Sequence, residues 1–218
     1  MKKFILMILS ILSIDQILKI YIKTHFELGG GVYILSFFRI FFVENPGMAY
    51  GVNFWTGYHG KILLSIFRFF FVFFISIFLY KNIKKGNSKY LTIPISLILS
   101  GAMGNFLDSA LYGLLFDTGT IYSQEAKKWI PYFGISKINS SFFEKKNAGG
   151  YASFLEGCVV DMFYFPIIDT NFPDWLPFIG GYNFQFFKPI FNLSDVVIFI
   201  GVFSLFIFHR KIKNVKVL

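Results

Sequence analysis

Three aspartates, Asp108, Asp161 and Asp195, each interrupt or border a run of apolar residues. Two carboxylates a few Å apart do not both ionise, and they share one proton. A water held between such a pair is deprotonated by one carboxylate while the other protonates the oxygen of a peptide carbonyl. This is aspartic peptidase chemistry. Spacing alone does not decide which two of the three aspartates form the pair.

Asp15 and Lys19 form a second group of ionisable residues within an apolar segment. They stand four residues apart, so on a helix they share one face and form an ion pair. An ionisable side chain inside a membrane span is costly and points to function. An ion pair that only fixes helix packing is an equally good interpretation of these two residues.

Other catalytic chemistries find little support. The three histidines, His25, His59 and His209, do not have the H-E-x-x-H spacing of zinc peptidases, and no G-x-S-x-G motif occurs. Cys158 lies among apolar residues, which suppress formation of a thiolate. We therefore expect no metal and no cofactor.

The composition places these residues in a membrane protein. Of the 218 residues, 55% are hydrophobic, 22% aromatic and only 15% charged, whereas about a quarter of a soluble domain is charged. Ten of the 21 Lys and Arg residues fall in three segments without acids, 2–3, 81–89 and 210–216. Basic segments that punctuate apolar runs are typical of cytoplasmic loops rather than of a nucleic-acid-binding surface.

The apolar runs predict an all-α integral membrane protein that forms a single membrane domain, 1–218. The expected transmembrane helices cover about 4–22, 62–80, 91–107 and 191–208. With the basic segments inside, both termini are cytoplasmic and the number of spans is even. The first span lacks a small-x-small cleavage site and is expected to be a retained anchor.

Two segments are then extracytoplasmic, about 23–61 and 111–189. The first alternates in a way that suits short strands. In the second, 117–150 is polar and reads as an insertion, and 151–189 is rich in aromatics and suits the membrane interface. This topology brings the aspartates to the outer side of the membrane.

Five motifs resemble those of the lipoprotein signal peptidases (signal peptidase II). In chain order they are Asp15-x-x-x-Lys19, the Asn-Pro-Gly-Met-Ala-Tyr-Gly run at 45–51, Gly101-x-x-Gly104-Asn105-x-x-Asp108, Val159-Val160-Asp161-Met162 and Phe191-Asn192-Leu193-Ser194-Asp195. They occur in the family's order and extend from the first span to the last, leaving the 117–150 insertion uncovered.

The resemblance implies an endopeptidase that removes the signal peptide from diacylglyceryl-modified prolipoproteins, cutting before the lipidated cysteine. It implies that Asp161 and Asp195 are the catalytic pair. It also implies a small β-cradle after the first helix. The positions it implies as substrate-binding or site-supporting are Asn45, Gly47, Gly104, Asn105, Asp108, Asn192, Asp15 and Lys19.

Two features depart from the family pattern. The family has an arginine after the aspartate at 108, which helps to hold the substrate backbone, and this chain has Ser109. Arg68 in the second span is a candidate replacement, although an arginine there more commonly snorkels to the interface. The insertion 117–150 is either a lid over the site or, more simply, a solvated loop.

These observations predict a multi-pass protein of the bacterial cytoplasmic (inner) membrane with its active site at the extracytoplasmic face. The expected partners are lipidated prolipoproteins and membrane lipids, with no nucleic acid, and the chain is expected to act as a monomer. A small proton-coupled transporter that uses the same carboxylates is the alternative, and a structural scaffold is a third. The lack of duplicated halves argues against the transporter.

Overall fold

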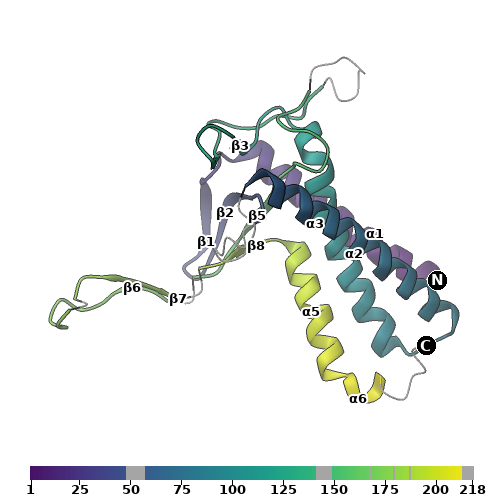
Figure 1. The fold of residues 1–218 in the computed structure, drawn as a ribbon. Coiled ribbons are helices and arrows are strands. Elements are labelled where there is room, and N and C mark those ends of the chain that lie inside the picture. Colours follow the sequence, from purple (N-terminus) through teal and green to yellow (C-terminus); the bar gives the residue numbers. More distant parts are fainter. Residues whose placement is uncertain (48–56, 141–148, 167, 179, 187, 213–218) are drawn as a thin grey trace.

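The computed structural model describes residues 1–47, 57–140, 149–166, 168–178, 180–186 and 188–212. The elements form a bundle of helices with a small sheet across one end of it (Figure 1). The helices are α1 (Lys2–His25), α2 (Tyr58–Lys84), α3 (Lys89–Leu115), α5 (Leu193–Ile207) and the short α6 (His209–Ile212).

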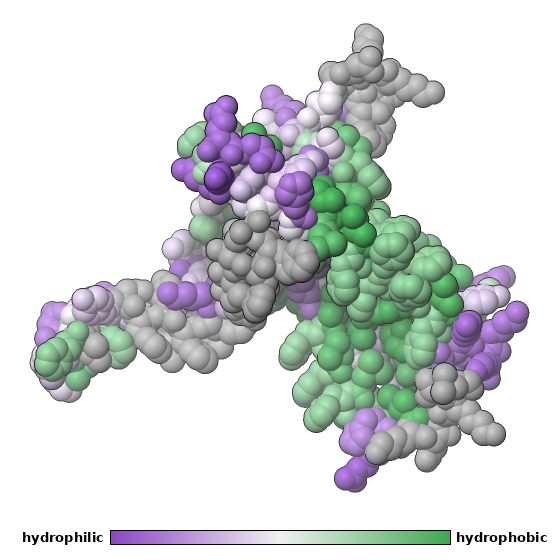
Figure 2. Space-filling model, in the orientation of Figure 1, coloured by the Kyte–Doolittle hydropathy of each residue, from purple (hydrophilic) through white to green (hydrophobic). Residues whose placement is uncertain are grey.

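Three of the described helices, α1, α2 and α3, are long and apolar enough to cross a membrane, and α5 is a shorter apolar helix of 15 residues. Each coincides with one of the expected spans. Their outward surface is hydrophobic over most of its length (Figure 2), and it carries many exposed phenylalanines, including Phe67, Phe74 and Phe206. A helix surface of this kind is suited to lipid contact.

Helix α3 packs against α1, α2 and α5 and is the most buried of the helices. It extends to Leu115, beyond the expected end at 107. Small residues let α5 approach it closely, since a Cβ added at Gly101 would lie 2.3 Å from the Ser194 carbonyl oxygen. Such close backbone approach is how apolar helices associate without a hydrophobic driving force between them.

The main sheet is antiparallel with the order β1-β2-β5-β8. Its strands are β1 (Gly31–Leu35), β2 (Phe38–Asn45), β5 (Val159–Tyr164) and β8 (Ile190–Phe191). The expected β-structure after the first helix therefore supplies only half of this sheet. The other two strands come from the segment between α3 and α5. The fold is therefore a helical bundle with a four-stranded sheet built from two separate segments of the chain.

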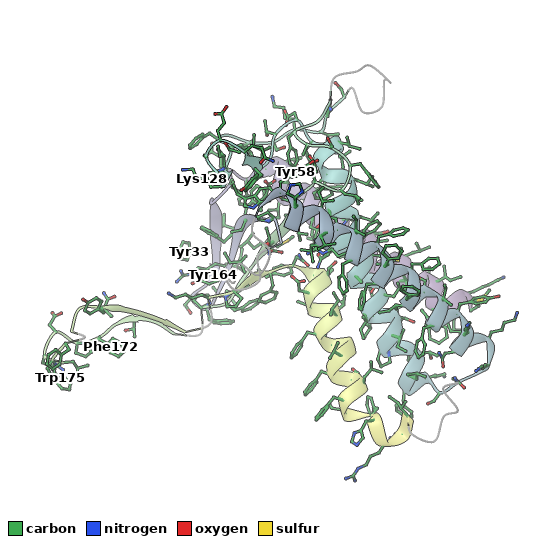
Figure 3. All side chains as sticks on the ribbon, in the orientation of Figure 1. Tyr33, Tyr58, Lys128, Tyr164, Phe172 and Trp175 are labelled. Atoms are coloured by element: carbon green, nitrogen blue, oxygen red, sulfur yellow. The ribbon has the colours of Figure 1, made fainter. Side chains whose placement is uncertain are left out.

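Two hairpins lie outside the main sheet. The first pairs β3 (Ile121–Ser123) with β4 (Lys128–Ile130) inside the predicted insertion. The second pairs β6 (Ile168–Asn171) with β7 (Asn183–Phe186) and projects away from the bundle (Figure 1). The loop at its tip exposes Trp175 and Phe178. Figure 3 shows Trp175 at the end of the hairpin that is far from the bundle. The lid hypothesis falls partly on 141–148, outside the described residues.

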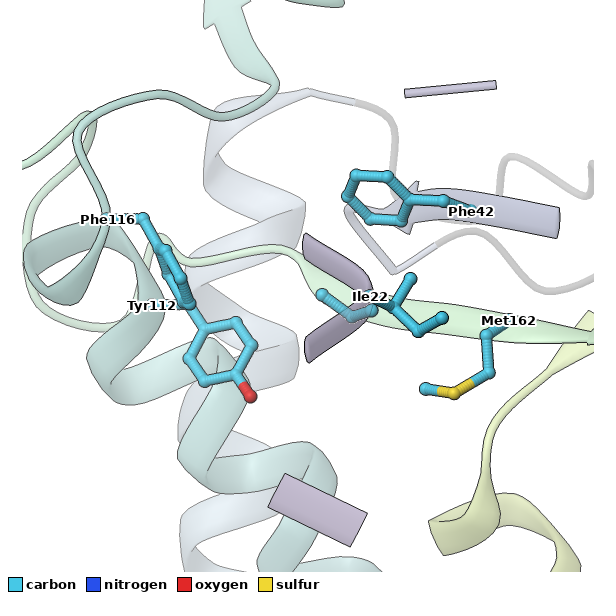
Figure 4. Close-up of a cluster of buried hydrophobic side chains, with 6 residues drawn as sticks. Ile22, Phe42, Tyr112, Phe116 and Met162 are labelled. Carbon is cyan, nitrogen blue, oxygen red and sulfur yellow. The ribbon is translucent and has the colours of Figure 1, made fainter. Parts of the chain in front are cut away.

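A compact core joins the sheet to the helices (Figure 4). It consists of buried side chains from α1, β2, α3, β5 and the C-cap residue that follows α3, namely Ile22, Phe42, Tyr112, Phe116, Val160 and Met162. Burying apolar surface stabilises by about 25 cal/mol per Å². This core therefore holds strands β2 and β5 at a fixed position against α1 and α3.

Beside this core, a buried ion pair connects α1 to β2 and to the insertion. The Lys23 ammonium contacts the Glu44 carboxylate and donates to the carbonyl oxygen of Thr118 at 3.0 Å. The second oxygen of Glu44 accepts from the backbone N–H of Thr120 at 2.6 Å. The ammonium also lies about 5 Å from the ring centroids of Phe116, Tyr132 and Tyr151. The insertion is thus attached to the bundle at its start.

Replacing one member of this pair tests its contribution to stability. We expect Glu44→Gln to lower the free energy of unfolding by about 3 kcal/mol, because it leaves the Lys23 charge buried without its partner. The double variant Lys23→Met/Glu44→Gln is expected to lose less than Glu44→Gln alone. Thermal unfolding in detergent measures both, with the exposed Glu27→Gln as control. Equal stability of Glu44→Gln and the native protein would contradict the assignment.

Candidate active site

Asp161 and Asp195 come together from two different elements. Asp161 lies on β5 opposite Val43 of β2, and Asp195 is the third residue of α5. The Asn192 side chain donates to Asp161 Oδ1 at 2.7 Å, and the Asn192 backbone N–H donates to Asp195 Oδ2 at 3.2 Å. One asparagine therefore ties the two carboxylates to each other.

The position of Asp195 is fixed by the start of its own helix. Asn192 is the N-cap of α5, and its side-chain oxygen accepts the Asp195 N–H at 3.1 Å. The Asp195 carboxylate accepts the Asn192 N–H in return, which completes a capping box. Helix capping and membership of the site are thus compatible, because capping uses one carboxylate oxygen and leaves the other to face its neighbours.

Asn45 holds Asp161 from the opposite side. Its side-chain amide donates to Asp161 Oδ2 at 3.1 Å, while its oxygen accepts the Gly47 N–H at 2.8 Å. Gly47 has a φ of 118°, and a Cβ there would lie 2.4 Å from Leu64 Cδ2. Only glycine suits that backbone conformation in that space. The turn after β2 therefore aims the Asn45 amide at the carboxylate.

Asn105 of α3 connects Asp195 to the interior of the bundle. Its amide donates to Asp195 Oδ1 at 2.9 Å. Its oxygen accepts from the Lys19 ammonium at 3.0 Å and from the Asn192 amide at 3.2 Å. Because every polar group of Asn105 is used, its orientation is determined by its neighbours.

Asp108 is held apart from the other two aspartates by Lys19. The Lys19 ammonium lies 2.7 Å from Asp108 Oδ2 and 2.9 Å from Asp15 Oδ2. Gln16 donates to Asp108 Oδ1 at 2.8 Å. Lys19 and Asp108 are both fully buried. Spacing alone allowed Asp108 to pair with Asp161 or with Asp195. In the structure its carboxylate instead belongs to this ion cluster.

Asp15 also contacts the start of α5. Its Oδ1 accepts the backbone N–H of Ser194 at 2.9 Å, so α1 supplies an acceptor to the first turn of α5. A Cβ at Gly104 would lie 2.1 Å from Ser194 Oγ and 2.6 Å from Asp15 Oδ2. The glycine in the α3 motif is therefore what lets α1, α3 and α5 meet at this point.

Ser109, which stands where the family has arginine, is met by a guanidinium from another helix. Arg68 of α2 donates through Nη1 to Ser109 Oγ at 2.6 Å. Lys61 of the same helix donates to the same oxygen at 3.2 Å. Arg68 thus points inward to α3, and the snorkelling interpretation is wrong.

Burial makes Asp161 a weaker acid than an ordinary aspartate. Removal from water, and after it the neighbouring Asp195 charge, raise the pKa of Asp161 to about 7. Hydrogen bonds from Asn45 and Asn192 to the carboxylate oppose this shift. Cys158 in contrast stays a thiol, because burial raises its pKa to about 12.

Some polar neighbours were not singled out from the sequence. Gln16 accepts from the Tyr112 hydroxyl at 3.1 Å while donating to Asp108, and Lys61 donates to Ser109. Gln16 was visible as a polar residue next to Asp15 in the first span. Nothing in the sequence marked Lys61 as a site residue, because it lies at the border of the apolar run 62–80, where lysine is common.

The fold and these contacts invite comparison with known proteins. The family model described as "Signal peptidase (SPase) II" matches residues 7–210. The chain belongs to the signal peptidase II family. It is 37% identical over 206 residues to the lipoprotein signal peptidase of Porphyromonas gingivalis, covering 94% of this chain and 81% of that protein. The corresponding protein of Amoebophilus asiaticus is 33% identical over 204 residues, 92% of this chain and 74% of that one.

Two solved structures have a similar fold, and each is titled as the structure of a bacterial membrane enzyme. The first has a TM-score of 0.58 at 22% identity and covers 97% of this chain and 89% of its own. The second has a TM-score of 0.52 at 23% identity, with 95% and 92% covered. Its family membership, together with three described helices that are long and apolar enough to cross a membrane, makes this chain a multi-pass membrane protein.

The raised pKa of Asp161 predicts how stability depends on pH. A carboxyl whose pKa is about 7 when folded and 3.8 when unfolded stabilises the folded state below pH 4. That contribution is lost as the pH rises from about 4 to about 7, and amounts to on the order of 4 kcal/mol. We expect Asp161→Asn to remove this part of the pH dependence, measured by thermal unfolding between pH 4 and 8.

The exposed Asp174→Asn variant is the control for this measurement, since it removes one carboxyl from the β6–β7 hairpin. It is expected to keep the pH dependence of the native protein. A native curve parallel to that of Asp161→Asn over the whole range would show that Asp161 titrates at its ordinary value.

Proposed function

We propose that this protein is an aspartic endopeptidase that removes the signal peptide from diacylglyceryl-modified prolipoproteins by cleaving before the lipidated cysteine. Its relatives in Porphyromonas gingivalis and Amoebophilus asiaticus are lipoprotein signal peptidases, which supports the substrate class. The observation that carries the proposal is the coupling of Asp161 to Asp195 through Asn192 at the end of the helical bundle. Family membership favours this activity over a proton-coupled transporter.

In the proposed mechanism Asp161 starts protonated and Asp195 ionised, as the raised pKa of Asp161 favours. Asp195 takes a proton from a water between them, and the water oxygen attacks the carbonyl carbon of the scissile bond. Asp161 gives its proton to the carbonyl oxygen, which yields a neutral gem-diol. When the C–N bond breaks, the departing nitrogen takes the proton from Asp195, and one hydroxyl returns its proton to Asp161.

The other site residues hold this pair in place. Asn45, Asn105 and Asn192 donate to the two carboxylates. Gly47 and Gly104 admit the backbone geometry that brings those amides there. Asp15, Lys19 and Asp108 fix α1, α3 and the start of α5 relative to one another. Preorganised donors of this kind require no rearrangement during the reaction.

The membrane arrangement is part of the proposal. Four spans formed by α1, α2, α3 and α5 place both termini in the cytoplasm, in keeping with the basic segments at 2–3, 81–89 and 210–216. The aspartates then lie at the extracytoplasmic face of the inner membrane. The lipid-facing phenylalanines let the diacyl chains of the substrate stay in the bilayer. The monomeric state is likewise part of the proposal.

Cleavage of a lipidated prolipoprotein by the purified protein tests the activity directly. We expect Asp161→Asn and Asp195→Asn each to reduce kcat by about 10³-fold or more, because the pair acts as a unit and one carboxylate cannot serve as both acid and base. Gel-shift or mass analysis of the released signal peptide provides the measurement. Asp174→Asn is the matched control, and full cleavage by either site variant would overturn the assignment of the pair.

Chelator treatment tests the absence of a metal from the reaction. An aspartate pair activates water without a metal, so we expect EDTA to leave the initial cleavage rate unchanged within about twofold. Inactivation by EDTA with recovery on addition of a divalent cation would instead point to metal-assisted hydrolysis.

A further inference from the structure

Lys61 and Arg68 of α2 bring two positive charges into the protein, and neither forms an ion pair with a carboxylate of the described residues. The ion pairs of the described residues are Lys19 with Asp15 and Asp108, and Lys23 with Glu44. The ammonium of Lys61 is buried, at 2% exposure, and its acceptor is the hydroxyl oxygen of Ser109. Arg68 uses the same oxygen. A pair of inward cations that share one neutral acceptor is an unusual arrangement.

The hydroxyl of Ser109 has no further capacity. Its oxygen accepts from both cations, and its own hydrogen is donated to the Asn105 carbonyl oxygen at 3.0 Å. A guanidinium carries five N–H donors and an ammonium three. Within the described part of the chain, Ser109 is the acceptor that hydrogen-bonds to either cation. Lys61 is buried, whereas Arg68 is only partly buried and uses Nη1 for this bond, so its remaining N–H groups are the donors left for a bound molecule.

These donors lie close to the proposed catalytic pair. Ser109 is four residues after Asn105, whose amide contacts Asp195. The guanidinium is thus bound one helical turn along α3 from the asparagine that contacts Asp195.

Charge balance indicates what kind of group these donors take. The charged side chains of the cluster are four carboxylates and three cations, namely Asp15, Asp108, Asp161, Asp195, Lys19, Lys61 and Arg68. With one proton shared by the catalytic pair, the charges cancel. An anionic ligand would unbalance this buried cluster, whereas a carbonyl oxygen accepts hydrogen bonds and brings no charge.

We propose that Arg68, assisted by Lys61, binds backbone carbonyl oxygens of the substrate next to the scissile bond, so that α2 supplies the cation that α3 lacks at position 109. This inference rests on the proposed function and assigns a substrate-binding role to residues outside the five motifs. Arg68 orients the extended substrate strand, and Ser109 holds the guanidinium in place.

Substitution of Arg68 tests the proposal. We expect Arg68→Gln to reduce kcat/KM for a lipidated prolipoprotein about tenfold to a hundredfold, mainly through KM, because hydrogen bonds from a charged donor to bound substrate are lost. Arg68→Lys is expected to retain part of the affinity, and Lys61→Met to shift KM in the same direction. Arg210→Gln, on the exposed end of the chain, is the matched control.

A transfer of the arginine distinguishes binding from structural support. In Arg68→Gln/Ser109→Arg the guanidinium originates from α3 but reaches the same space, since Ser109 Oγ lies 2.6 Å from Arg68 Nη1. We expect this double variant to recover most of the lost kcat/KM. Thermal unfolding of each variant shows whether it folds.

Binding measurements keep the inference separate from the proposed activity. In an Asp195→Asn background, the affinity for the uncleaved lipidated prolipoprotein is expected to fall at least tenfold on adding Arg68→Gln. Native kcat/KM or unchanged affinity in a folded Arg68→Gln variant would overturn the inference while leaving the peptidase intact. Failure of the native protein to cleave would overturn the proposed function, and the binding difference would still decide the role of Arg68.

Discussion

The buried ammonium of Lys19 is the interaction on which the rest of the site depends. It bridges Asp15 of its own helix and Asp108 of α3, and it donates to Asn105, which holds Asp195. Two carboxylates at such depth are tolerable only with a cation between them. The ion cluster therefore sets the distance between α1 and α3, and through Asn105 it sets the orientation of a proposed catalytic side chain.

Around this cluster, amides transmit position from one element to the next. Asn192 starts α5 and touches both Asp161 and Asp195, while Asn45 ends β2 and holds Asp161. An amide both donates and accepts, so each asparagine relates two neighbours without adding charge. The same property explains why a membrane enzyme of such low charge content can fix two carboxylates at all: the fixing groups are neutral.

The positions of the four apolar helices, the motifs and the family could be predicted from the sequence, because apolar run length and local spacing determine them. The predicted span 91–107 lies within α3, which continues to Leu115, because apolar run length marks the membrane-crossing part of a helix and not its end. The pairing of β5 and β8 with β2 depends on contacts distant in sequence, which no local pattern encodes. The inward direction of Arg68 depends on how α2 is rotated against α3, and periodicity does not resolve that in an almost uniformly apolar helix.

The capping box of α5 has a consequence for biosynthesis. Asn192 and Asp195 are translated last among the site residues, after α1, α2 and α3 have left the ribosome. A nascent chain that stops short of α5 therefore carries the Lys19 ion cluster and Asp161 but lacks Asp195, the second carboxylate of the proposed catalytic pair. On the proposed assignment, the pair is completed only when α5 has formed its first turn, so truncated copies in the membrane lack the proposed catalytic pair.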